Sequence, residues 1–186
     1  SSEYEYGGSL PSVLINSVNY QQANALSGVA GSKFLSADPR KAVVNIFCEY
    51  KTKDYVRSTT GSGYFINPDG VILTNAHVAQ FLLLEDTNKE TSTDCVVRTG
   101  LRASSTYEAE LLYISPAWII EHADLINEVK PKGTGERDYA LLYITRRTDD
   151  LAMKNIVPAI YPDLSALNQN MYGDDLSIAG YPSKTI

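Results

Sequence analysis

Short runs of apolar and β-branched residues recur along the chain between residues 42 and 145, and turn-forming residues separate them. Such runs are typical of β-strands. The pattern predicts strands over residues 42–50, 61–67, 71–74, 94–98, 107–114 and 139–145. Closely spaced short strands favour a β-barrel or sandwich, so we expect an all-β fold rather than a parallel α/β architecture.

The turn between the second and third predicted strands has a sequence that favours a tight hairpin. Asn67-Pro68-Asp69-Gly70 combines a Pro that fixes φ with an Asp-Gly pair that tolerates positive φ. We therefore expect these two strands to pair with each other.

One helix is expected to interrupt the strands after Ser115. The Ser115 side chain can accept a hydrogen bond from a free amide of the first turn, and Pro116 suits the first helical position. Four residues then fall at helical spacing along one face: Trp118, His122, Leu125 and Val129. The pattern predicts a surface helix inserted between strands, with Trp118 either packed in the core or part of a docking patch.

The two ends of the chain have weaker patterns. Residues 1–41 are rich in Ser, Gly, Asn, Ala and Tyr without a sustained period, which predicts an extension or linker. Beyond residue 150 the strand signal fades, and one further strand is predicted over residues 176–179.

Charge and composition exclude several classes of partner. The chain carries 16 Lys and Arg against 22 Asp and Glu, a formal net charge of -6 at pH 7. Sequence-independent binding to nucleic acid or to an anionic membrane needs basic residues that neutralise phosphates, so neither partner is expected. No apolar run approaches the roughly 18 to 20 residues that span a bilayer.

The cysteines and histidines show no metal-ligand pattern, and we expect neither a metal nor another cofactor. Cys48 and Cys95 each fall in a predicted strand, where they could form a disulfide or stay as two buried free thiols. His122 is expected to be a surface or partly packed side chain.

His77 directly follows the predicted hairpin, in the segment TGSGYFINPDGVILTNAHV of residues 60–78. This segment resembles the trypsin-like serine proteases, and within them the bacterial HtrA and glutamyl-endopeptidase types. In that family a Thr-Ala-x-His or Thr-Asn-x-His segment after such a hairpin bears the general base. The resemblance therefore implies that His77 is a catalytic base.

A second match lies 61 residues after His77, where Asp138-Tyr139-Ala140-Leu141-Leu142 has the family's Asp-x-Ala-Leu-Leu form. The resemblance implies that Asp138 accepts the Nδ1 proton of His77, fixes the tautomer and stabilises the imidazolium. A weaker match is Gly180-Tyr181-Pro182, which is similar to the turn before the nucleophile loop in bacterial members.

The family's nucleophile motif, Gly-x-Ser-Gly, does not occur in the 186 residues. The resemblance implies a chymotrypsin-like double β-barrel: residues 1–41 as an N-terminal extension, 42–148 as the first barrel, and 149–186 as the interdomain connection and first strands of an incomplete second barrel. It implies a serine endopeptidase acting on proteins or peptides, whose Ser lies in a missing C-terminal segment. The chain alone is then expected to be inactive.

The residues leave other interpretations open. His77 could be a structural histidine, Asp138 a solvated loop residue, and Asp124 is the main rival for the orienting role. The chain could be a non-catalytic, protease-like module that binds proteins, or an unrelated β-barrel with a coincidental His. A secreted, periplasmic or cell-surface location is expected from the bacterial resemblance, the absence of an initiator Met and the possible disulfide.

Overall fold

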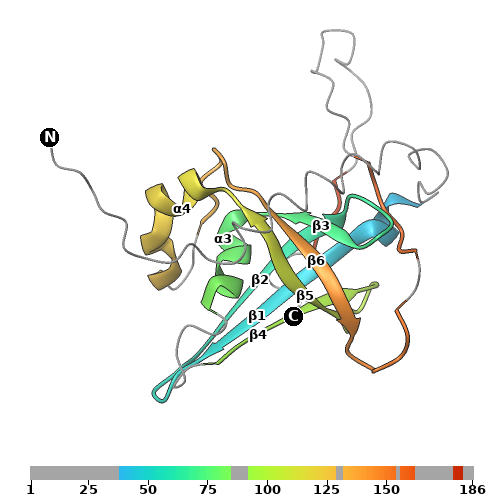
Figure 1. Cartoon of the computed structure of the whole chain (residues 1–186), viewed down its shortest axis with the longest axis horizontal. Helices are drawn as coiled ribbons and strands as arrows, with labels where there is room; N and C mark the ends of the chain where they lie inside the picture. Colours follow the sequence, from blue (N-terminus) through green and yellow to red (C-terminus); the bar gives the residue numbers. More distant parts are fainter. Residues whose placement is uncertain (1–37, 85–91, 129–131, 154–155, 162–177, 182–186) are drawn as a thin grey trace, which may run out of the picture.

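The structure is a computed structural model that describes residues 38–84, 92–128, 132–153, 156–161 and 178–181. Antiparallel strands form a closed barrel in the order β1-β2-β3-β6-β5-β4 (Figure 1). The strands are β1 (Val43–Lys51), β2 (Val56–Phe65), β3 (Val71–Thr74), β4 (Ser92–Thr99), β5 (Ser104–Ile114) and β6 (Ala140–Arg147). The predicted β-barrel is thereby confirmed.

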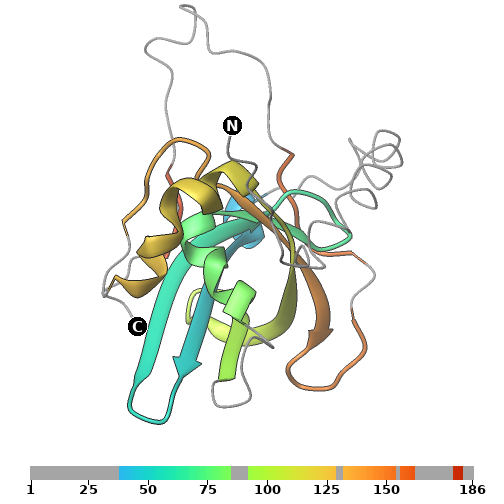
Figure 2. The same cartoon turned by 60° about the vertical axis from the view of Figure 1, so that its left-hand side comes forward.

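Short helices connect these strands. Two are α-helical, α3 (Ala76–Ala79) after β3 and α4 (Pro116–His122) after β5. The 3-10 helices are η1 (Pro39–Ala42), η2 (Gln80–Leu84) and η3 (Ala123–Asn127). Figures 1 and 2 both show α3 and α4 on the same side of the barrel.

The inserted helix begins as the sequence predicts and ends earlier. Ser115 Oγ accepts a hydrogen bond from Trp118 N at 3.4 Å, and Pro116 occupies the first turn. Regular α-helix stops at His122 and continues as the 3-10 helix η3, while Val129 lies outside the described residues. Trp118 is 1% exposed and belongs to the core, so of its two predicted environments the structure shows the packed one.

The core fills the barrel with inward-facing aliphatic and aromatic side chains. Fully buried members from the strands are Val44, Ile46, Phe65, Ile72, Val97, Ile114 and Leu142. Burying each large side chain contributes about 1.5–3 kcal/mol relative to leaving it in water. Strands β1 and β4 are also joined covalently, because Cys48 and Cys95 lie opposite each other and form a disulfide.

The predicted hairpin is present between β2 and β3. Asn67 Oδ1 accepts a hydrogen bond from Val71 N at 2.9 Å, and Ile66 N donates to Val71 O at 2.8 Å. The turn also receives a later part of the chain, since Val157 N donates to Pro68 O at 2.9 Å and the Val157 side chain is 1% exposed. Residues 156–161 therefore pack against one end of the barrel.

The strand predicted over residues 176–179 is not found where the structure describes it. Residues 176 and 177 lie outside the described residues, and Ile178 and Ala179 have no strand pairing. Tyr181 instead docks through single contacts: its N–H donates to Ser62 Oγ at 2.8 Å, and its hydroxyl donates to Gly100 O at 2.8 Å. The predicted division into a first barrel and an incomplete second barrel stays a prediction.

A search of the described residues for a helix long and apolar enough to cross a membrane found none.

Candidate active site

Strand pairing brings the segments after β3 and before β6 together. Thr74, the last residue of β3, pairs with Ala140, the first residue of β6. Because the strands are antiparallel, the residues just after Thr74 and just before Ala140 must leave the barrel at the same place. His77 and Asp138 come from these two segments. Asn75 adds a direct link, because its Nδ2 donates to Asp138 O at 3.0 Å.

Asp138 binds His77 through both of its carboxylate oxygens. Oδ2 lies 2.8 Å from Nδ1 of the imidazole, and Oδ1 accepts the backbone N–H of His77 at 3.0 Å. That N–H lies in the first turn of α3, where no intrahelical acceptor exists for it. The carboxylate therefore fixes both the ring and the backbone that carries it.

The two partners differ in their access to solvent. The Asp138 side chain is 2% exposed, whereas the His77 side chain is 19% exposed. A buried carboxylate is stable when hydrogen-bond donors surround it, and His77 supplies two of them. When the imidazole is neutral and Nδ1 donates to Asp138, Nε2 is the nitrogen that can accept a proton.

A groove of about 990 Å³ reaches Asp138 of this pair, while His77 is not among its lining residues. Its lining includes Thr74, Asn75, Asp138 and Tyr139, together with Tyr161 and Ile178 from the later part of the chain. The Tyr139 ring is 45% exposed and stacks on Tyr113, with ring centroids 5.8 Å apart. Burial raises the pKa of the Tyr113 hydroxyl, and its hydrogen bond to Tyr139 acts in the same direction.

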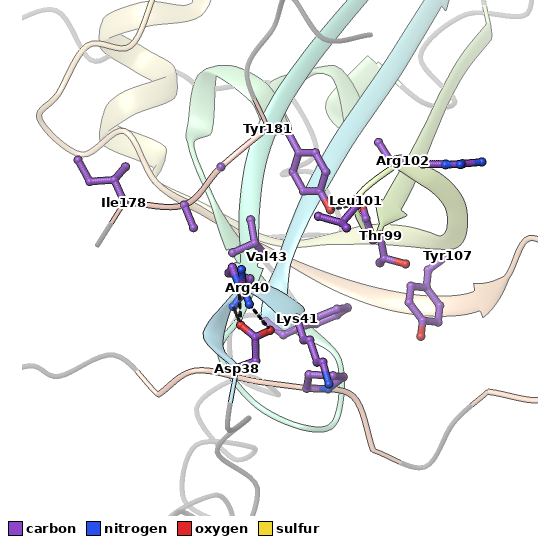
Figure 3. A pocket seen from close by; sticks show the side chains of 16 residues that line it. Asp38, Arg40, Lys41, Val43, Thr99, Leu101, Arg102, Tyr107, Ile178 and Tyr181 are labelled. Atoms are coloured by element: carbon purple, nitrogen blue, oxygen red, sulfur yellow. Dashed lines mark hydrogen bonds and ion pairs between the residues drawn. The ribbon is translucent and has the colours of Figure 1, made fainter. Parts of the chain in front are cut away.

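A second pocket, of about 790 Å³, lies away from the pair (Figure 3). Residues 99–103, between β4 and β5, form one wall, and the segment around Tyr181 forms another. Neither His77 nor Asp138 lines this pocket. Of these two pockets, only the groove of about 990 Å³ reaches the pair, and it does so through Asp138.

Comparison with protein families gives one assignment. The family model of the trypsin-like peptidase domain matches residues 61–185, which include both His77 and Asp138. The chain belongs to this family. A comparison with curated proteins finds no match to the chain. The barrel is accordingly a chymotrypsin-like barrel, and the interpretation as an unrelated β-barrel with a coincidental His is wrong.

Two sequence candidates lie elsewhere in this peptidase-family barrel. Asp124, the rival for the orienting role, is exposed in η3, and Asp138 occupies the position beside Nδ1 of His77. His122 is partly packed: its ring lies 5.6 Å from that of Trp118, and its side chain is 31% exposed. Among the described residues no cluster of three His, Cys, Asp or Glu side chains could hold a metal ion.

The His77–Asp138 pair also has neighbours that the sequence did not single out. Thr134 N donates to Asp138 Oδ2 at 3.2 Å, and Trp118 Nε1 donates to Thr134 Oγ1 at 2.8 Å. Gly133 lies directly beside the His77–Asp138 hydrogen bond. No local pattern marks these residues, because their role depends on which distant segment they contact.

Proposed function

We propose that His77 and Asp138 are the general base and the orienting carboxylate of a serine endopeptidase of the bacterial HtrA or glutamyl-endopeptidase type. One observation carries the proposal: Nδ1 of a partly exposed histidine lies 2.8 Å from a carboxylate that is almost fully buried. An imidazole held in this way has its Nδ1 proton fixed and its Nε2 lone pair free to take a proton.

The chemistry that follows is acyl transfer. Nε2 of His77 removes the proton of a serine hydroxyl while Oγ attacks the carbonyl carbon of a peptide bond. Asp138 stabilises the imidazolium formed in this step. The imidazolium then gives its proton to the leaving amine, and the acyl-enzyme remains. Water attacks the ester in a second cycle with the same proton movements, which releases the acid and restores the serine.

The proposal also concerns the nucleophile. Gly-x-Ser-Gly is absent from the 186 residues, so we place the serine and the amides of its oxyanion hole in a segment that follows them in the full-length protein. Residues 149–186 would connect the first barrel to a second one. The groove beside Asp138 would then lie between the two barrels, and this chain alone would not hydrolyse peptides.

We further propose a secreted, periplasmic or cell-surface location. The supporting observation is the disulfide between Cys48 and Cys95, because disulfides persist mainly in oxidising compartments. The substrate would be a protein or peptide that binds in the groove of about 990 Å³.

A fluorophosphonate probe tests the proposal on the full-length gene product. Intact-mass analysis should show one added probe per molecule, and peptide mapping should locate the probe on a serine beyond residue 186. His77→Ala should abolish labelling, and Asp138→Asn should slow it by about 10⁴-fold, the loss that this change causes in such triads. The matched control His122→Gln should label at the wild-type rate.

The alternative function is a non-catalytic module that binds proteins through a peptidase-like barrel. Absence of labelling in a folded, disulfide-bonded full-length protein would contradict the enzyme and favour this module. Labelling that persists in His77→Ala would show that a different residue activates the nucleophile.

A further inference from the structure

Residues of the chain shortly before Asp138 lie against the His77–Asp138 pair. We call residues 132–137 the covering loop. The covering loop starts at Lys132, the first described residue after Glu128, and leads directly into Asp138. The loop is exposed for most of its length, yet it contacts the buried carboxylate at two places. Such contacts are costly to maintain in an exposed loop unless something else holds it.

The first contact is a hydrogen bond from the backbone. Thr134 N donates to Asp138 Oδ2 at 3.2 Å, the same oxygen that lies 2.8 Å from His77 Nδ1. Together with the His77 backbone N–H on Oδ1, this gives the carboxylate three donors. A donor on Oδ2 restricts rotation of the carboxylate and so keeps that oxygen directed at the imidazole.

The second contact is the close approach of Gly133. A Cβ atom added at this position would stand 3.2 Å from Asp138 Oδ2 and 3.8 Å from His77 Nδ1. The glycine backbone therefore lies against the His77–Asp138 hydrogen bond with no room to spare. Because it occupies that face, water has less access to the hydrogen bond, which strengthens it.

A buried residue of the inserted helix anchors the loop. Trp118 is 1% exposed and belongs to the core, and its Nε1–H donates to Thr134 Oγ1 at 2.8 Å. A buried indole N–H needs an acceptor, and this one finds it in the covering loop. The link therefore joins the rigid core to the residue whose backbone N–H binds Asp138.

A second link between α4 and the loop is of a different kind. Arg137 Nη1 donates to Glu121 Oε1 at 2.7 Å, but these side chains are 44% and 50% exposed. Exposed ion pairs contribute little to stability because water and salt screen them. We therefore expect Trp118, not Glu121, to hold the loop.

We propose that Trp118 and Thr134 are positioning residues of the His77–Asp138 pair: the indole N–H fixes the Thr134 hydroxyl, and this directs the Thr134 amide at Asp138 Oδ2. The inference rests on the proposed function for its catalytic meaning. Trp118 of the inserted helix α4 then helps to set the histidine tautomer.

The test measures the Nδ1 proton of His77 by NMR in the 186-residue chain, which needs no nucleophile. The chain has two histidines, and His122→Gln assigns their signals. Wild type should show a downfield, slowly exchanging Nδ1 proton and Nε2 as the unprotonated nitrogen. Thr134→Val removes the hydroxyl and keeps the backbone N–H and the side-chain shape. We expect it to raise the exchange rate of the Nδ1 proton about five- to tenfold, the effect of one lost hydrogen bond.

Three further variants separate positioning from general stability. Thr134→Ser keeps a hydroxyl and should restore the wild-type exchange rate, and Trp118→Phe should behave as Thr134→Val does. Glu121→Gln breaks the exposed ion pair and should leave the rate unchanged. Unfolding free energies measured in parallel identify any variant that exchanges faster only because it unfolds more often.

The proposal is overturned if Thr134→Val leaves the Nδ1 proton unchanged, or if Thr134→Ser accelerates its exchange as much as Thr134→Val does. Neither result depends on peptidase activity. Failure of the full-length protein to react with a fluorophosphonate would refute the proposed function and leave this inference standing. An unaltered Nδ1 proton in Thr134→Val, with normal labelling of the full-length protein, would do the reverse.

Discussion

Gly61 on β2 packs against Val78, the residue that follows His77, and this contact allows a quantitative prediction. A Cβ atom added at Gly61 would stand 2.9 Å from Val78 Cγ1, 3.2 Å from Val78 Cβ, and nearer still to Cγ2. Val78 is 2% exposed, so its side chain has no free space to enter. Gly61→Ala must therefore displace Val78, and α3 with it.

The magnitude follows from opposing effects. Overpacking of a core costs about 1–3 kcal/mol, while replacing Gly by Ala restricts the unfolded chain and recovers about 0.4–1 kcal/mol. Gly61→Ala should thus lower the free energy of unfolding by about 1–2 kcal/mol. Val78→Ala removes two buried methyl groups and should cost about 2 kcal/mol. The double variant should cost only about 2 kcal/mol, because the methyl group introduced on β2 then occupies space that the Val78 side chain has left.

Urea unfolding of the wild type, both single variants and the double variant completes the cycle. The expected coupling between the two positions is about 1–2 kcal/mol, with m-values unchanged. Costs that add to within about 0.5 kcal/mol would refute the packing argument. A second readout is the His77 N–H, which donates to Asp138 Oδ1: it should exchange faster in Gly61→Ala and recover in the double variant.

Two other predictions concern the barrel. Replacing Cys48 and Cys95 by Ala should lower the free energy of unfolding by about 4 kcal/mol, because the disulfide closes a loop across 47 residues of sequence; denaturant unfolding measures it. At Asp149, the hydrogen bond from Arg147 holds the carboxyl pKa at about 2. A pKa depressed in the folded state stabilises the protein above about pH 4, and this is lost as pH falls through about 2. An NMR titration should give that midpoint, rising toward about 3.9 in Arg147→Gln.

The sequence predicts the parts of the barrel whose signals are local. The hairpin at residues 67–70 and the start of α4 at Ser115 depend on neighbouring residues, and both are present. The N-terminal part of β2 could not be predicted in the same way. Residues 56–60 include the polar run Arg-Ser-Thr-Thr, and they become a strand because they pair with β1, as Arg57 does with Tyr50. The pattern of residues 56–60 alone does not show that β1 will pair with them.

In the candidate site, too, the residues marked by local motifs could be predicted, and those placed by distant contacts could not. His77 and Asp138 follow from motifs, since each lies at a fixed distance from a recognisable strand. The short helix α3 escaped prediction because its four residues span barely one turn and have no period to detect. The role of Thr134 could not be predicted because the residues around it do not indicate that Trp118, 16 residues earlier, is its hydrogen-bond partner.

The geometry of the pair has a consequence for how the peptidase would work. Among the described residues, the hydrogen bonds to the Asp138 side chain come from this barrel and its connections: from His77 in α3 and from Thr134 in the covering loop. The barrel itself therefore sets the tautomer and orientation of the imidazole before a nucleophile arrives. Donors that are already in place need no reorganisation during the reaction. This preorganisation is the main source of electrostatic catalysis. Under the proposed function, a segment outside this barrel would only have to bring a serine hydroxyl to Nε2, and Trp118→Phe in α4 should alter catalysis without changing a contact to the substrate.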